Sequence, residues 1–129
     1  FNDVMTGMRM KKKTDEQKEV RKNAIEEATK KATEVPLEVA ELCFDVLKLS
    51  KIVVEKGNPN SVSDAGVAAE SALTGVRGAR LNVLINLSGI EDDAFCNSMK
   101  QKVNDLEFES VMLRDKVAVL VEEVIQENG

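Results

Sequence analysis

The chain has 129 residues, enough for one domain with one core, and 43% hydrophobic and 32% charged residues are typical of a folded globular protein. A net charge of −5 excludes a general nucleic-acid or acidic-membrane binder, because both need a basic surface. The lack of histidine removes Ser-His-Asp and Cys-His nucleophile systems and every histidine-bearing zinc site, so any chemistry must use carboxylates, amides, lysines or backbone groups.

The first nine residues are predicted to end an amphipathic helix, because their apolar side chains fall at helical spacing. These side chains are Phe1, Val4, Met5 and Met8. We therefore expect part of the domain to precede this sequence. A basic run, residues 11–13, comes before a second helix that begins at Thr14, where Thr-Asp-Glu-Gln has the form of a capping box.

The second helix is predicted to continue to Pro36, since apolar residues recur at three- and four-residue steps up to Ala32. Proline lacks an amide donor and clashes with the preceding turn, so a break or a kink is expected at Pro36. The apolar pattern then resumes from Leu37 to Val54, and Gly57 is a suitable C-terminal cap.

The last helix is predicted to run from Asp92 or Asp93 to about Gln126. Its apolar residues alternate steps of three and four, which is the heptad pattern of a coiled coil interrupted by one serine. This seam consists of Val103, Leu106, Ser110, Leu113, Val117, Leu120 and Val124. No segment alternates with period two, so the sequence predicts an all-α helical bundle with one long C-terminal helix. A seam of this length also predicts a homodimer or a larger assembly.

The helix between these two, residues 62–87, follows the loop Gly-Asn-Pro-Asn-Ser at 57–61, and Ser61 with Asp64 gives it a second capping signature. Small and polar residues form one narrow stripe on it: Asp64, Ala68, Ser71, Gly75, Asn82 and Asn86. Because most other positions are apolar, the helix is predicted to be largely buried with this stripe facing inward. The stripe then either allows another helix to pack closely or forms the wall of a ligand site. The second alternative is possible because amides offer both donors and acceptors.

Residues 57–64, GNPNSVSD, followed by residues 81–87, LNVLINL, resemble the signature of the formiminotransferase-cyclodeaminase family, in its cyclodeaminase/cyclohydrolase domain. Residues 1–5, 8–10, 35–37 and 90–95 agree with this resemblance, which spans essentially the whole chain. It implies that residues 1–129 are a single helical domain, the C-terminal part of the family's cyclodeaminase/cyclohydrolase domain.

The resemblance implies a folate enzyme of one-carbon metabolism and histidine degradation. The family domain closes 5-formiminotetrahydrofolate to 5,10-methenyltetrahydrofolate with loss of ammonia, or hydrolyses the methenyl form to 10-formyltetrahydrofolate. Asp64 is the candidate catalytic carboxylate, which stabilises the cationic carbon and moves a proton. The candidate substrate-binding residues are Asn58, Asn60, Ser63, Asn82, Asn86 and Lys12. We expect Asp64 and the amides to line one pocket.

The remaining expectations concern cofactors, partners and location. No metal and no cofactor beyond the tetrahydrofolate substrate is expected, and no nucleic-acid or membrane partner. Lys12 suits the anionic glutamate tail of a folate, although a solvated loop also explains the lysine run. Cys43 and Cys96 are predicted to be reduced thiols, as is usual in the cytoplasm. The alternative to an enzyme is a non-catalytic helical oligomerisation module.

Overall fold

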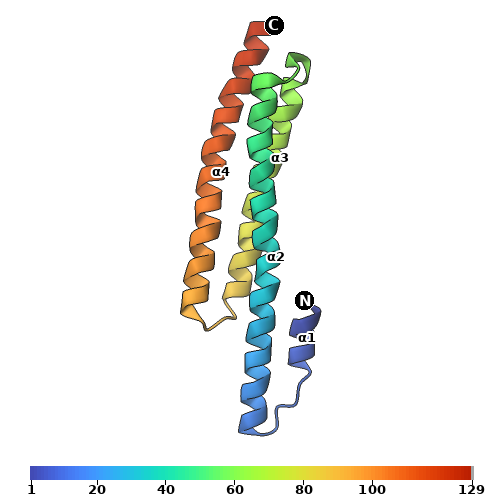
Figure 1. Cartoon of the computed structure of the whole chain (residues 1–129), viewed down its shortest axis with the longest axis vertical. Helices are drawn as coiled ribbons and strands as arrows, with labels where there is room; N and C mark the ends of the chain where they lie inside the picture. Colours follow the sequence, from blue (N-terminus) through green and yellow to red (C-terminus); the bar gives the residue numbers. More distant parts are fainter. Residues whose placement is uncertain (129) are drawn as a thin grey trace.

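The computed structural model describes residues 1–128, which form four α-helices and no strand. Helix α1 spans Asn2–Met8, α2 spans Asp15–Lys56, α3 spans Val62–Leu87 and α4 spans Asp93–Asn128, with a short 3-10 helix, Pro59–Ser61, before α3. The three long helices lie side by side in an elongated bundle, and α1 packs on the N-terminal part of α2 (Figure 1). The prediction of an all-α bundle with a long last helix is confirmed.

Most predicted helix ends are confirmed by their hydrogen bonds. The backbone N–H of Gln17 donates to Thr14 Oγ1 at 3.1 Å, and the N–H of Thr14 donates to Gln17 Oε1 at 3.2 Å, so the capping box at α2 forms. Asp92 caps α4 by accepting from the N–H of Phe95 at 3.1 Å. The N–H of Gly57 closes α2 on the carbonyl of Val53 at 2.7 Å.

The second capping signature does not form. The side chain of Ser61 makes no capping bond to α3, because its backbone already continues the 3-10 turn and lacks the extended conformation of a capping residue. The loop is closed one step earlier, where Asn58 Oδ1 accepts from the N–H of Asn60 at 3.0 Å.

Helix α2 runs through Pro36 as one element, so the break considered from the sequence does not occur (Figure 1). The helix is held on both sides of the proline by side chains buried against the bundle. Thr33 and Ala40 are fully buried and Leu37 is nearly so. Their packing offsets the hydrogen bond that the proline cannot make.

The core lies along the centre of the bundle in two clusters. The first, near the 57–62 end of the bundle, consists of Leu47, Val54, Val62, Ala65, Ala69, Ala72, Val117 and Val121. The second, near the turn between α3 and α4, consists of Leu37, Val83, Leu87, Ile90, Cys96, Met99 and Val103. Three members of the predicted α4 seam, Val103, Ser110 and Val117, are fully buried, whereas Leu106, Leu113, Leu120 and Val124 are half-buried. Among the described residues no helix has the length and hydropathy needed to cross a membrane.

Candidate functional site

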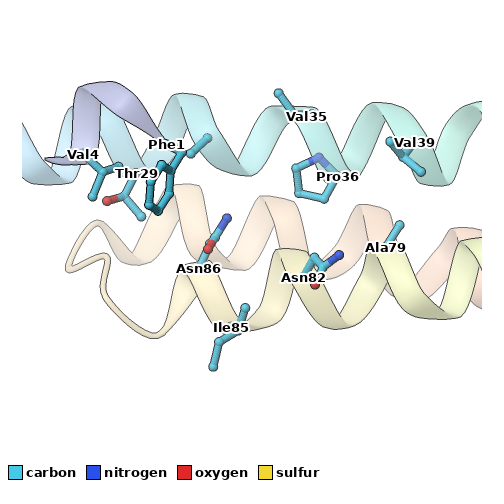
Figure 2. A pocket seen from close by; sticks show the side chains of 11 residues that line it. Phe1, Val4, Thr29, Val35, Pro36, Val39, Ala79, Asn82, Ile85 and Asn86 are labelled. Atoms are coloured by element: carbon cyan, nitrogen blue, oxygen red, sulfur yellow. The ribbon is translucent and has the colours of Figure 1, made fainter.

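A groove of about 800 Å³ lies between α2 and α3 and is bordered at one end by α1 (Figure 2). It is lined by Phe1, which precedes α1, by Val4 of α1, by Thr29, Ala32, Val35, Pro36 and Val39 of α2, and by Ala79, Asn82, Ile85 and Asn86 of α3. Its walls are mostly aliphatic, with two carboxamides and one hydroxyl as the polar side chains. This combination of an apolar surface and a few polar groups is typical of a site for a small organic molecule.

Two of the residues predicted from the sequence, Asn82 and Asn86, lie in this groove. They are one turn apart on α3, and both side chains point toward α2 (Figure 2). Pro36 and Phe1 point back toward α3 from the opposite wall. The two carboxamides therefore offer donors and acceptors to a ligand that fills the space between the helices.

The other residues predicted near Asn82 lie at the opposite end of α3. Asp64 precedes Asn82 by 18 residues, which is about 27 Å along the helix. Asn58 and Asn60 are exposed in the loop beside it, and Ser63 borders a separate hollow between α3 and α4. Within one chain these residues do not line one pocket with Asn82 and Asn86, so the pocket expected from the sequence does not form in a single copy.

The stripe is also not buried, although the sequence predicted that it faces inward. Asp64, Ser71 and Asn82 are exposed and Asn86 is half-buried. Helix α3 instead buries its alanine-rich face against its neighbours: Ala65, Ala69, Ala72, Leu73, Val76, Ala79 and Val83. Small side chains allow close helix approach, which explains why this face packs in preference to one carrying Val67, Leu81 and Ile85.

The middle of the stripe supports the packing alternative. A Cβ added at Gly75 would lie 2.5 Å from Sγ of Cys43, so α2 and α3 approach each other too closely here for any larger residue. Cys43 is half-buried, Cys96 is buried, and both are free thiols. The stripe thus has a packing role at Gly75 and borders an open groove at Asn82 and Asn86.

Lys12 lies in the exposed turn between α1 and α2, at the end of α1 that is farther from Phe1 (Figure 1). Helix α1 has seven residues, so the turn is about 10 Å from the Phe1 end of the groove. Lys12 is therefore outside the groove, and a substrate would need a long extension to reach it.

Several lining residues were not predicted as functional: Ala79 and Ile85 of α3, and every lining residue of the facing wall. Helix α2 carries two apolar faces, one buried through Leu37 and Ala40 and one open through Val35 and Val39. The open face was detectable in the sequence as a second set of apolar residues at helical spacing. Pro36, a proline in the middle of a helix, was the other feature of the sequence that could have indicated this wall of the groove.

The turn that follows Asn86 is fixed to α2 by charged groups. Lys30 Nζ lies 2.8 Å from Asp92 Oδ2 and 5.6 Å from the ring centroid of Phe95. Lys22 Nζ lies 2.9 Å from Glu91 Oε2. The hydrogen bond between Lys30 and Asp92 raises the pKa of the lysine and lowers the pKa of the carboxyl group. These contacts hold the start of α4 against the helix that forms one wall of the groove.

Replacing Asp92 with Asn is expected to lower the Tm at neutral pH but not in acid. Asparagine keeps the helix cap, so the change isolates the charge. With its pKa lowered, Asp92 stabilises the fold above about pH 4, and this contribution disappears as the pH falls through the lowered pKa. Thermal unfolding at about pH 7 and about pH 2 checks this. An equal Tm difference at both pH values would contradict it.

The comparisons with known proteins agree with one another. The family model described as formiminotransferase-cyclodeaminase matches residues 1–105. A methenyltetrahydrofolate cyclohydrolase from Methylorubrum extorquens is 43% identical over 117 residues, which are 91% of this chain and 56% of that protein. A formimidoyltransferase-cyclodeaminase from Sus scrofa is 37% identical over 106 residues, 82% of this chain and 20% of that protein.

A solved structure agrees as well. The formiminotetrahydrofolate cyclodeaminase from Thermotoga maritima superposes with a TM-score of 0.81 at 25% identity, covering 97% of this chain and 58% of that one. The chain thus spans a little over half the length of the cyclohydrolase and of the solved cyclodeaminase that it matches. The family model matches most of the chain, and the relatives are similar to it in sequence over most of its length. The chain therefore belongs to the formiminotransferase-cyclodeaminase family.

Proposed function

We propose that this chain provides the tetrahydrofolate-binding groove of a cyclodeaminase or methenyltetrahydrofolate cyclohydrolase. The supporting observation is the groove between α2 and α3, where Asn82 and Asn86 face an aliphatic wall. Its volume of about 800 Å³ suits a molecule the size of a folate, and its apolar sides suit a pterin ring. The names of the relatives, a cyclohydrolase and cyclodeaminases, support the same substrate class.

Both reactions need a polar group at the carbon that bridges N5 and N10. In the hydrolysis, water adds to the methenyl carbon, the bond from that carbon to N5 breaks, and N5 takes a proton. In the deamination, N10 adds to the formimino carbon and ammonia leaves. Each reaction passes through a tetrahedral carbon next to a delocalised positive charge. A carboxylate stabilises this charge and moves the proton. Asp64 is our proposed carboxylate for this step.

Asp64 is about 27 Å from Asn82 in the same chain, so we propose that it acts on the groove of a second copy in a homodimer. If two α3 helices pack antiparallel by their exposed sides, with the two-fold axis level with residue 75, residues equally far from the axis face each other. Asp64 precedes Gly75 by 11 residues and Asn86 follows it by 11. Asp64 of one subunit, with Asn58, Asn60 and Ser63 beside it, then lies opposite the carboxamides of the other.

The surface of the chain supports a second copy on this side. Helix α2 exposes a heptad seam of Val35, Val39, Leu42, Val46, Leu49 and Val53, each between 43% and 62% exposed. The chain exposes 8401 Å², whereas a compact monomer of 14.2 kDa exposes about 6,800 Å². The excess is about twice the area that each partner buries in an ordinary interface.

Three finer assignments complete the proposal. Lys12 pairs with the carboxylates of the folate glutamate tail, which leaves the groove along α1. The protein works in the cytoplasm, where Cys43 and Cys96 stay reduced. Tetrahydrofolate is its only small-molecule partner, and the deamination would serve histidine degradation.

Replacing Asn82 with Ala is expected to weaken binding of 5-formyltetrahydrofolate by about 1–3 kcal/mol, because one polar partner of the ligand is lost. The Tm of the free protein should stay unchanged, since Asn82 is exposed. Calorimetric titration and thermal unfolding measure the two quantities. Thr74→Ala, on an exposed position of the same helix outside the groove, is the matched control. Unchanged affinity in Asn82→Ala would contradict the proposed site.

The oligomerisation module is the competing function, and ligand binding separates the two. The Tm of a folate-binding protein rises at saturating ligand, because only the folded state binds the ligand. A purely structural module shows no such gain with any tetrahydrofolate derivative.

A further inference from the structure

Pro36 removes a backbone hydrogen bond beside the groove, and the fold does not require a proline at this position. It lies in the interior of the 42-residue helix α2, far from either end, where a proline costs about 3 kcal/mol relative to alanine. The cost arises because proline has no N–H, so the carbonyl of the residue four positions earlier, Ala32, loses its helical donor. The ring also presses on that carbonyl.

The residue whose carbonyl loses its donor lines the groove. Ala32 and Pro36 are one turn apart on the same face of α2, and both line the groove. The ring of Pro36 points across it toward α3, where Asn82 points back (Figure 2). The residue whose carbonyl lacks its helical donor and the two carboxamides therefore border the same groove.

The surrounding packing gives no structural reason for the proline. Thr33, Leu37 and Ala40 hold α2 against the bundle, and the helix passes Pro36 without a break. No turn begins at Pro36, and it lies on the open face rather than in either core cluster. An alanine or valine would continue the helix with a complete set of hydrogen bonds.

We propose that Pro36 frees the carbonyl of Ala32 to accept a hydrogen bond from the ligand, and that this carbonyl selects a planar heterocycle with an amino group. An acceptor on α2 opposite carboxamides on α3 matches a ring edge that carries N–H donors beside an acceptor. The aminopyrimidinone edge of a pterin is such an edge. This inference rests on the proposed folate function and assigns a specificity-determining position within it.

The test compares wild type with Pro36→Ala and Pro36→Val, measuring Tm by calorimetry and affinity by titration with 5-formyltetrahydrofolate. Both variants restore the N–H, and valine also keeps the apolar volume beside the ligand. We expect the Tm of each to rise by about 5–10 °C, while each binds the folate about 3- to 10-fold more weakly. Stability and binding should thus change in opposite directions.

A folate analogue without the 2-amino group makes the test specific. Wild type should prefer the amino form, and both variants should lose that preference. If Pro36→Val keeps wild-type affinity and preference, the ring only fills space and the inference is wrong, while the folate function stands. If wild type binds neither compound, the folate function and this inference fail together.

Discussion

Replacing Asp64 with Asn is expected to lower turnover of methenyltetrahydrofolate by about 10²-fold or more with little change in Tm. The amide keeps the size of the side chain and removes only its charge and its ability to move a proton. Asp64 is exposed in the first turn of α3, so the fold does not depend on it. Steady-state rates and thermal unfolding of the purified variant measure both effects. Full activity in Asp64→Asn would remove it as the catalytic carboxylate.

A mixture of variants tests whether Asp64 acts across two subunits. Asp64→Asn and Asn82→Ala are each expected to be poorly active at low substrate concentration. After the two are unfolded together and refolded, half of the dimers are mixed, and each mixed dimer holds one intact site. The mixture should then recover about a quarter of wild-type activity. If both residues act within one chain, the mixture shows only the average of the two parents.

Replacing Val117 with Asp is expected to lower the free energy of unfolding by at least about 4 kcal/mol, because a charge would enter the fully buried centre of the bundle without a partner. Urea unfolding followed by circular dichroism measures the change. Val119→Asp is the matched control, since Val119 is the same residue type two positions later on α4 and is 56% exposed. Its effect should stay within about 0.5 kcal/mol. Equal effects in the two variants would contradict the buried seam.

The elements of the fold were predictable because their signals are local. Thr14 and Gln17 cap α2 as their spacing indicates, and Gly57 ends it. The heptad spacing from Val103 to Val117 predicted the face of α4 that is buried, although Phe108 and Met112 are exposed on another face. Each of these signals lies within one helix or at its end.

The faces of α2 and α3 were harder to predict, because each helix carries two apolar faces and only the tertiary packing decides which one is buried. The alanine face of α3 packs, while Val67 and Ile85 stay exposed. The expectation that Asp64 joins Asn82 is not met within one chain for a related reason. A shared helix face says nothing of distance along the helix, and these two residues are about 27 Å apart.

The candidate site was only half visible in the sequence. Asn82 and Asn86 were identified on α3, whereas Thr29 and Ala32 of the facing wall carry no motif of their own. Pro36 was interpreted as a break or a kink in α2, because the rule for proline in helices does not include the tertiary contacts that keep this helix continuous.

The most direct test follows the absorbance of 5,10-methenyltetrahydrofolate with purified wild-type protein, Asn82→Ala and buffer alone. The groove between α2 and α3 is proposed to bind the folate, so the wild-type protein should speed the loss of the methenyl absorbance well above the rate in buffer. Asn82→Ala should need a higher substrate concentration to reach the same rate. A wild-type rate equal to that in buffer, with no gain in Tm at saturating folate, would contradict the proposed function.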